Sequence, residues 1–321
     1  CYKFRFNFCF KMNIYILILA LMISSCYSEK NSLAAIKSQI KINDTKEIIS
    51  ILSSDSLMGR DNKNKGYFKA ADYVIKYLKK NNINPLYDEF KDIFYSDSIE
   101  TFNIVGTVGE FLYERKTILI GAHLDHIGIS GVGADSIYNG ANDNASGCVS
   151  VLQIGSFLSQ YKWDYNIVLA LFAEEEKGLR GSYNLAKRMK KENINLKYVI
   201  NFEMIGKELQ IGKNKVYLTG YEMSNLAQEI NKVVPGFVTF FSKSKEFNLF
   251  ERSDNYPFYK VFNIPSQTLS SFDFENYNYY HHVDDEVDNL NIKNLNDIIT
   301  SSAFFISNFL NKKTKINLIT N

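Results

Sequence analysis

Cysteine is scarce in this sequence of 321 residues, which has only Cys1, Cys9, Cys26 and Cys148. Cys1 and Cys9 lie before a short apolar segment with the features of an export signal and Cys26 lies just after that segment, so only Cys148 remains for a folded domain. A single cysteine excludes a disulfide framework there. Cys148 follows a glycine at the start of an apolar helical pattern, so we expect a small buried apolar side chain rather than a nucleophile.

An excess of charge of one sign is also missing. The chain has 37 Lys and Arg against 35 Asp and Glu, a net charge of +2. Removing Lys3, Arg5 and Lys11 with the export segment leaves 34 against 35, a net charge of −1. Lysine pairs such as Lys79-Lys80 fall in helix-like segments, where a solvated face explains them. Because the chain has no surplus of basic residues, we expect no nucleic-acid partner.

The apolar run near the N-terminus, Ile14–Ile23, is too short to span a bilayer. Its position after Lys11 is typical of the core of a signal peptide. The following Ile23-Ser24-Ser25-Cys26 resembles a bacterial lipobox, in which the cysteine carries lipid and becomes the first mature residue. We therefore expect a signal peptide at 1–25, with Met12 as the true start. The mature protein is then an exported cell-envelope lipoprotein, attached to the membrane only through Cys26; a plain secretory signal is the alternative.

The rest of the chain shows no internal repeat, low-complexity segment or Pro/Gly linker that would divide it. We expect a tether or N-terminal helix at 26–44, one domain at 45–313 and a tail at 314–321. Apolar periodicity predicts helices at Gly66–Asn82, Ala145–Gln160, Gly181–Lys191 and Ile292–Leu310, and strands at Ile104–Val108, Thr117–Ile120, Ile167–Phe172 and Tyr198–Ile200. This alternation predicts an α/β fold with a mixed, largely parallel central sheet and helices on both faces.

Side chains that bind metals follow four of the strand-like runs. They are His123 and Asp125, the triplet Glu174–Glu176, Glu203 and His281, and a loop that opens a helix contributes Asp143. The carboxyl ends of strands are where ligands bind in open α/β sheets.

Each of these residues also has an ordinary explanation. Asp143 alone is best explained as a helix cap, a His-x-Asp pair as a hydrogen-bonded histidine, and an acidic triplet as a solvated turn. Together, however, they place several carboxylates at one sheet edge, where they repel one another strongly unless cations neutralise them. A divalent metal site resolves this repulsion.

Several separated segments match, in order, the motifs of a known family. They are LSSD through GR at Leu52–Arg60, GAHLDHIG at Gly121–Gly128, NGANDNASG at Asn139–Gly147, EEKGLRGS at Glu175–Ser182, NFEMIG at Asn201–Gly206, SDNYPF at Ser253–Phe258 and YHHVDDEVDNL at Tyr280–Leu290. Over nearly all of the mature chain, the sequence resembles the dizinc exopeptidases that include bacterial leucyl aminopeptidase, aminopeptidase Y and, more distantly, glutaminyl cyclase.

The resemblance assigns roles to the candidate residues and implies two zinc ions per chain. Asp143 would bridge the ions; one would add His123 and Glu203, and the other Glu176 and His281. Asp125 would accept the other imidazole N–H of His123 and fix its tautomer. The register makes Glu175 the general base, and Glu174 an extra, exposed acid.

Two departures from the family pattern stand out. Glu203 occupies a position where the family commonly has aspartate, so this ligand is one methylene longer. Asn255 stands where the family often has histidine, so the substrate contacts of that loop do not carry over to this chain. His126 and His282 fall outside the matched ligand positions, and we expect hydrogen-bonded or exposed roles for both.

The resemblance implies an aminopeptidase that hydrolyses N-terminal residues of peptides. Glutaminyl cyclase is the enzymatic alternative, although the segment Gly178–Ser182 fits the peptidases better. A surface lipoprotein that kept the fold only as a binding module is the non-catalytic alternative.

Overall fold

A nine-stranded sheet forms the centre of the computed structural model, which describes residues 32–130, 133 and 135–319. Its strands are β1 (Ile83–Pro85), β2 (Lys91–Ser96), β3 (Ile99–Val108), β4 (Thr117–His123), β7 (Asn166–Phe172), β8 (Leu196–Glu203), β9 (Val216–Leu218), β10 (Val238–Thr239) and β11 (Ser266–Ser270). The order across the sheet is β1-β3-β7-β4-β8-β11-β9-β10, and β2 pairs with β3. A separate hairpin joins β5 (Gly128–Ile129) to β6 (Ile137–Tyr138).

The central strands of the sheet run parallel, whereas strands nearer its two edges include antiparallel pairs. β4 runs parallel to both β7 and β8, and β8 runs parallel to β11. β3 pairs antiparallel with β7, and β9 pairs antiparallel with β11. The parallel register places His123 opposite Phe172, and Glu203 opposite Ser270. The mixed, largely parallel sheet predicted from the sequence is therefore confirmed, and its parallel strands end at a common edge.

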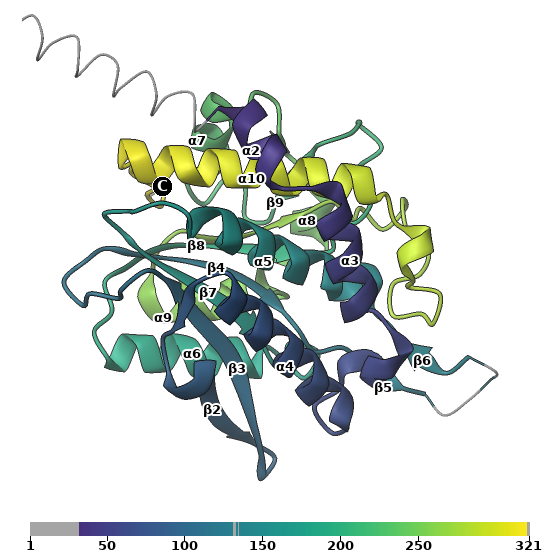
Figure 1. Cartoon of the computed structure of the whole chain (residues 1–321). Helices are drawn as coiled ribbons and strands as arrows, with labels where there is room; N and C mark the ends of the chain where they lie inside the picture. Colours follow the sequence, from purple (N-terminus) through teal and green to yellow (C-terminus); the bar gives the residue numbers. More distant parts are fainter. Residues whose placement is uncertain (1–31, 131–132, 134, 320–321) are drawn as a thin grey trace, which may run out of the picture.

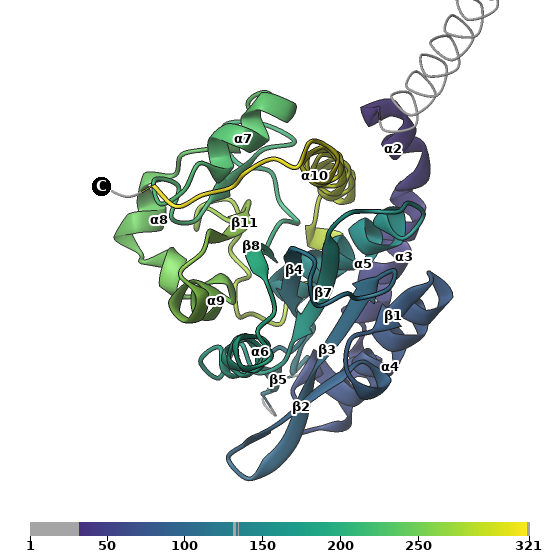
Figure 2. The same ribbon diagram turned by 90° about the vertical axis from the view of Figure 1, so that its left-hand side faces the viewer.

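Helices cover both faces of this sheet (Figures 1 and 2). One face carries α3 (Ile42–Leu52), α4 (Lys65–Lys80), α5 (Ser146–Leu158) and α10 (Ile292–Lys312), and the other carries α6 (Arg180–Lys191) and α9 (Asn255–Phe262). Shorter helices are α2 (Leu33–Gln39), α7 (Leu226–Val233) and α8 (Ser242–Glu246). No helix within the described ranges has the length and apolarity needed to cross a membrane.

Alternation along β4 explains why both faces are covered. Ile118 and Ile120 pack into the core beneath α5 and α10, whereas Leu119 packs into the core beneath α6 and α9. Successive strand residues point to opposite faces, so a strand that is apolar at every position must be buried on both sides. All seven residues of β4 are buried accordingly.

The predicted helices form within a few residues of their expected bounds, for example Lys65–Lys80 against Gly66–Asn82. Cys148 lies in the first turn of α5, is fully buried, and donates through its thiol to the carbonyl of His123 at 3.0 Å. Burial raises the pKa of this thiol to about 12, as befits an unreactive core residue. The expected signal peptide and Cys26 lie outside the described residues.

Candidate metal centre

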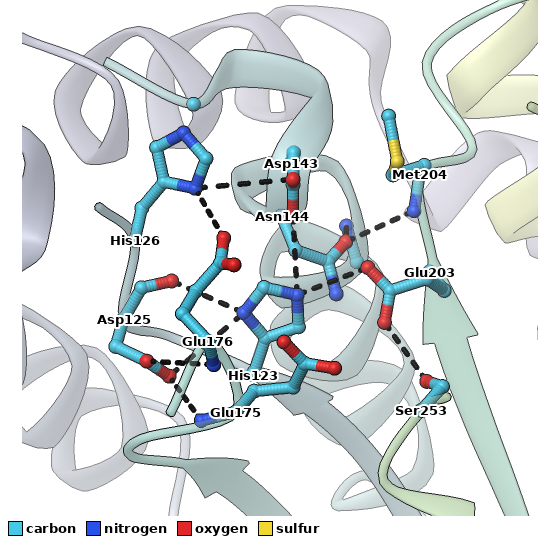
Figure 3. A network of polar contacts seen from close by, with 12 residues as sticks. His123, Asp125, His126, Asp143, Asn144, Glu175, Glu176, Glu203, Met204 and Ser253 are labelled. Atoms are coloured by element: carbon cyan, nitrogen blue, oxygen red, sulfur yellow. Dashed lines mark hydrogen bonds and ion pairs between the residues drawn. The ribbon is translucent and has the colours of Figure 1, made fainter. Parts of the chain in front are cut away.

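Five chain segments deliver the candidate residues to one edge of the sheet, and His281 comes from the segment after β11. β4 and β8 end on His123 and Glu203, while Glu175 and Glu176 follow β7 by three and four residues. Asp143 comes from the turn Ala141–Ala145 that leads into α5. Figure 3 shows these side chains converging on one small volume.

The two carboxylate oxygens of Asp143 face two different groups of ligands. Its Oδ1 lies 3.3 Å from Nε2 of His123, whose other close carboxylate is Oε1 of Glu203 at 2.9 Å. Its Oδ2 lies 3.3 Å from Nε2 of His281, which is also 3.1 Å from Oε2 of Glu176. The five residues expected as ligands therefore fall into two groups that share Asp143.

Both groups fit a divalent ion. Two donors on one tetrahedral zinc ion lie roughly 3.3 Å apart, because the bonds from zinc to nitrogen or oxygen are about 2.0–2.2 Å long. The donor separations of 2.9–3.3 Å around His123 and His281 are close to that value. Imidazole and carboxylate are also the donors that zinc accepts alongside thiolate.

The charged groups of the site favour the binding of a cation. Burial lowers the pKa of His123, but the carboxylates of Glu203 and Glu175 outweigh burial and raise that pKa well above its usual range. Burial raises the pKa of Asp143, but His126, His123 and His281 hold it well below its usual range. Within the described ranges, only histidines form ion pairs with the carboxylates of Asp143, Glu176 and Glu203. Carboxylates gathered around imidazole groups in this way form a site that suits a metal ion.

Glu175 stands beside the His123 group and is half-buried, at the wall of an open cavity. Burial, together with the charges of Glu203 and Asp254, raises its pKa well above the usual range despite the opposing effect of His123. A carboxyl group whose pKa is raised holds a proton more readily than an ordinary carboxylate does, which suits a general base that later acts as an acid. Its neighbour Asp254 is buried, and burial raises the pKa of Asp254 to about 8.

Asp125 does not hold His123 in the way the sequence led us to expect. The backbone carbonyl of Asp125, at 3.1 Å, is the acceptor for Nδ1 of His123, and the carboxylate lies 3.8 Å away. That carboxylate instead accepts from the backbone N–H groups of Glu175 at 3.1 Å and Glu176 at 3.4 Å. Asp125 therefore positions both the peptide that carries the candidate base and the imidazole, the latter through its backbone.

The expectation that Glu174 is exposed is wrong. Its side chain is buried, accepts a hydrogen bond from the Asn62 amide, and lies 3.4 Å from the ammonium of Lys177. Asn62 comes from a segment more than 100 residues away, so the acidic triplet alone carried no sign of this partner. His282, by contrast, is exposed and pairs with Asp284 at 3.3 Å.

The buried Arg60 and Asp285 fix the loop that carries Asp143. Arg60 donates to the backbone carbonyls of Leu52, Leu124, Asn139, Gly140 and Asp143 at 2.5–3.3 Å. The carboxylate of Asp285 accepts from the backbone N–H groups of Asn142 at 2.7 Å and Asp143 at 3.0 Å. Both residues lie in motifs matched in the sequence, but their roles depend on contacts across the fold.

An open cavity adjoins the His123 group. Its polar end is formed by His123, Asp143, Glu175, Glu176 and Glu203, and its apolar wall includes Met204, Tyr217, Phe272, Phe274 and Tyr280. The loop of Asn255 contributes Ser253 to this cavity, whereas Asn255 itself is buried and bonds to Phe250, Ser266 and Thr268.

The fold and the site together define an α/β protein with carboxylate and histidine ligands gathered at the carboxyl edge of a largely parallel sheet. Comparison with family models gives a match to peptidase family M28 over residues 103–305, and the chain belongs to this family.

Individual relatives share this fold or part of this sequence. A probable zinc metalloprotease of Pyrenophora tritici-repentis is 36% identical over 88 residues, which cover 27% of this chain and 20% of that protein. The chain therefore aligns with about a fifth of the length of this curated relative. The LapA aminopeptidase of Legionella pneumophila superposes with a TM-score of 0.71 at 18% identity, over 87% of this chain and 74% of that one. A glutaminyl cyclase of Bacteroides thetaiotaomicron gives a TM-score of 0.64 at 17% identity, over 84% of this chain and 98% of that one.

Proposed function

We propose that the protein is a zinc-dependent aminopeptidase that removes N-terminal residues from peptides. The observation that carries this proposal is that the two carboxylate oxygens of Asp143 face different groups of ligands. One oxygen faces His123 and Glu203, and the other faces Glu176 and His281. A shared carboxylate of this kind suits two neighbouring ions, and membership in a peptidase family supports hydrolysis of peptide bonds.

The two groups around Asp143 would hold zinc, and the bound metal would supply polarisation of the scissile carbonyl and a lowered pKa of the attacking water. Glu175 takes the proton from that water and returns it to the departing amine. Asp125 keeps Glu175 in place by accepting its backbone N–H at 3.1 Å. Glu175 lies at the polar end of the cavity, so a proton that it accepts stays close to the leaving group.

The apolar wall of the cavity supports an uncharged N-terminal side chain as the preferred substrate. Phe272, Phe274 and Tyr217 line this wall beside Glu203, and an apolar side chain placed there loses its contact with water. The carboxylates at the polar end of the cavity suit the positive charge of a free α-amino group.

Glutaminyl-peptide cyclisation is the second candidate, because the chain superposes on nearly the full length of the Bacteroides cyclase. The discriminating experiment offers the zinc-loaded protein a panel of aminoacyl p-nitroanilides and, separately, a glutaminyl peptide. We expect release of nitroaniline from apolar aminoacyl substrates and no cyclised product. Cyclisation without hydrolysis would replace the aminopeptidase proposal, and neither reaction in a zinc-loaded protein would favour a binding module.

We also propose that the protein is exported and held at the bacterial cell envelope through lipid on Cys26. The support is the sequence Ile23-Ser24-Ser25-Cys26 after a short apolar run. Metabolic labelling with a radioactive fatty acid tests the proposal. Label is expected on the wild-type chain and not on Cys26→Ser, and an unlabelled wild-type protein would contradict lipidation.

A further inference from the structure

His126 lies beside the Glu176 and His281 group and not at the surface. Its side chain is buried, and Nδ1 is 2.8 Å from Oε1 of Glu176 and 3.9 Å from Oδ2 of Asp143. The ring is held closely, because a Cβ atom on Gly140 would lie only 2.6 Å from its Cδ2. The backbone of Gly140, with φ of +58°, therefore makes room for this imidazole and fixes its direction.

The distances between the metal-binding atoms of His126, Asp143, Glu176 and His281 are close to the distances between ligands on one zinc ion. They run from 2.8 Å for His126 and Glu176 to 3.9 Å for His126 and Asp143, and the two pairs made by His281 measure 3.1 and 3.3 Å. Donors on one tetrahedral zinc ion lie roughly 3.3 Å apart. One ligand atom from each of the four residues lies within 4.8 Å of the ligand atoms of the other three.

Among the residues that the structure describes, the opposite group has three protein donors, from His123, Asp143 and Glu203. These three line the cavity together with Glu175, whereas His126 and His281 do not line it. The group with three protein donors is therefore the one that faces the cavity in which substrate would bind.

We propose that His126 is a fourth protein ligand, so that the two metal positions are unequal. One position has four protein ligands, as a structural zinc site does: His126, Asp143, Glu176 and His281. This position binds the first zinc ion, because it has the higher affinity. The position made by His123, Asp143 and Glu203 keeps an open place for water or substrate. This inference rests on the metal-binding part of the proposed function and not on peptide hydrolysis.

X-ray absorption on the metal-free full chain loaded with one equivalent of zinc tests the inference directly, because the imidazole signal counts histidine ligands. We expect two imidazoles on that ion, from His126 and His281. A count of one, with His126 merely hydrogen-bonded to Glu176, would overturn the inference. A chain that takes up no zinc would overturn the proposed function as well, so the two failures are distinguishable.

The neighbouring histidines provide a matched pair of variants. Asparagine at position 126 is too short to reach the ion, so His126→Asn should weaken binding of the first equivalent by more than 100-fold in chelator competition, with one imidazole remaining. His282→Asn changes an exposed side chain and should bind zinc as the wild type does. Unchanged affinity in a folded His126→Asn chain would contradict the inference; if that variant does not fold, the imidazole count of the wild type decides.

Discussion

The hydroxyl of Ser253 donates a 2.9 Å hydrogen bond to Oε2 of Glu203, while Oε1 of the same carboxylate lies 2.9 Å from Nε2 of His123 (Figure 3). Ser253 in turn accepts from the side chain of Asn201 at 2.8 Å. This chain of contacts holds a glutamate where the related peptidases commonly have aspartate. It leaves one oxygen of the longer side chain for the ion and fixes the other.

Replacing Ser253 should loosen that arrangement. In Ser253→Ala, Oε2 of Glu203 loses its donor, and we expect zinc affinity to fall by about 10-fold or more, as for other groups that orient metal ligands. Ser253→Thr keeps a hydroxyl and should bind zinc within a few-fold of the wild type. Chelator competition measures both. Equal affinities for the alanine and threonine variants would show that Glu203 needs no support from this residue.

Glu175→Gln should separate catalysis from metal binding. The substitution removes the proton acceptor and keeps the size of the side chain, so we expect kcat to fall by about 10²–10⁴-fold with zinc content unchanged. Glu174→Gln is the matched control, because Glu174 is buried next to it in sequence but bonds to Asn62 and Lys177 instead. Turnover retained in Glu175→Gln would remove this residue from the role of base.

Arg60 should contribute to stability more than any surface arginine. Arg60→Met leaves several buried carbonyls without donors, and an unsatisfied buried polar group costs about 1–3 kcal/mol, so we expect unfolding free energy to fall by at least about 3 kcal/mol. Urea denaturation measures the loss. Arg252→Met changes an exposed arginine and should leave the unfolding midpoint nearly unchanged. Equal effects of both substitutions would contradict the role assigned to Arg60.

The stability of the metal-free protein should fall at alkaline pH because of His281. Burial lowers the pKa of His281, but Asp143 and Glu176 outweigh it and raise the pKa to about 10, from an ordinary value of 6.5. A raised histidine pKa stabilises the fold fully below the ordinary value, and the contribution is lost as pH rises through about 10.

Urea midpoints at pH 7 and pH 9.5 measure this loss. The wild type should lose more than His281→Gln, and zinc should remove the difference because the ion replaces the proton. A midpoint that falls equally in both metal-free chains would exclude His281 as the cause.

The central strands and the metal ligands could be predicted because their signals are local. Thr117–Ile120 and Ile167–Phe172 are continuous apolar runs, and a strand buried on both faces needs no partner to be recognised. His123 and Glu203 end such runs, so the common edge of a parallel sheet brings them together. The short strands β9 and β10, near one edge of the sheet, have no continuous apolar run and were not predicted.

The residues that sequence reasoning missed depend on partners far away along the chain. Glu174 is buried because Asn62 reaches it, and Asp285 acts on backbone N–H groups more than 140 residues away. His126 follows Asp125 directly, and only the turn at Gly140 shows that its ring points at Glu176. Spacing in the sequence cannot distinguish these inward-facing side chains from exposed ones such as His282.

The most direct test of the account is a zinc titration of the metal-free chain while hydrolysis of an apolar aminoacyl p-nitroanilide is followed. We expect no hydrolysis without zinc and maximal activity at two equivalents per chain, since Asp143 divides its oxygens between two ligand groups. Hydrolysis by the metal-free chain, or a chain that binds two equivalents of zinc and hydrolyses no aminoacyl substrate, would contradict the account.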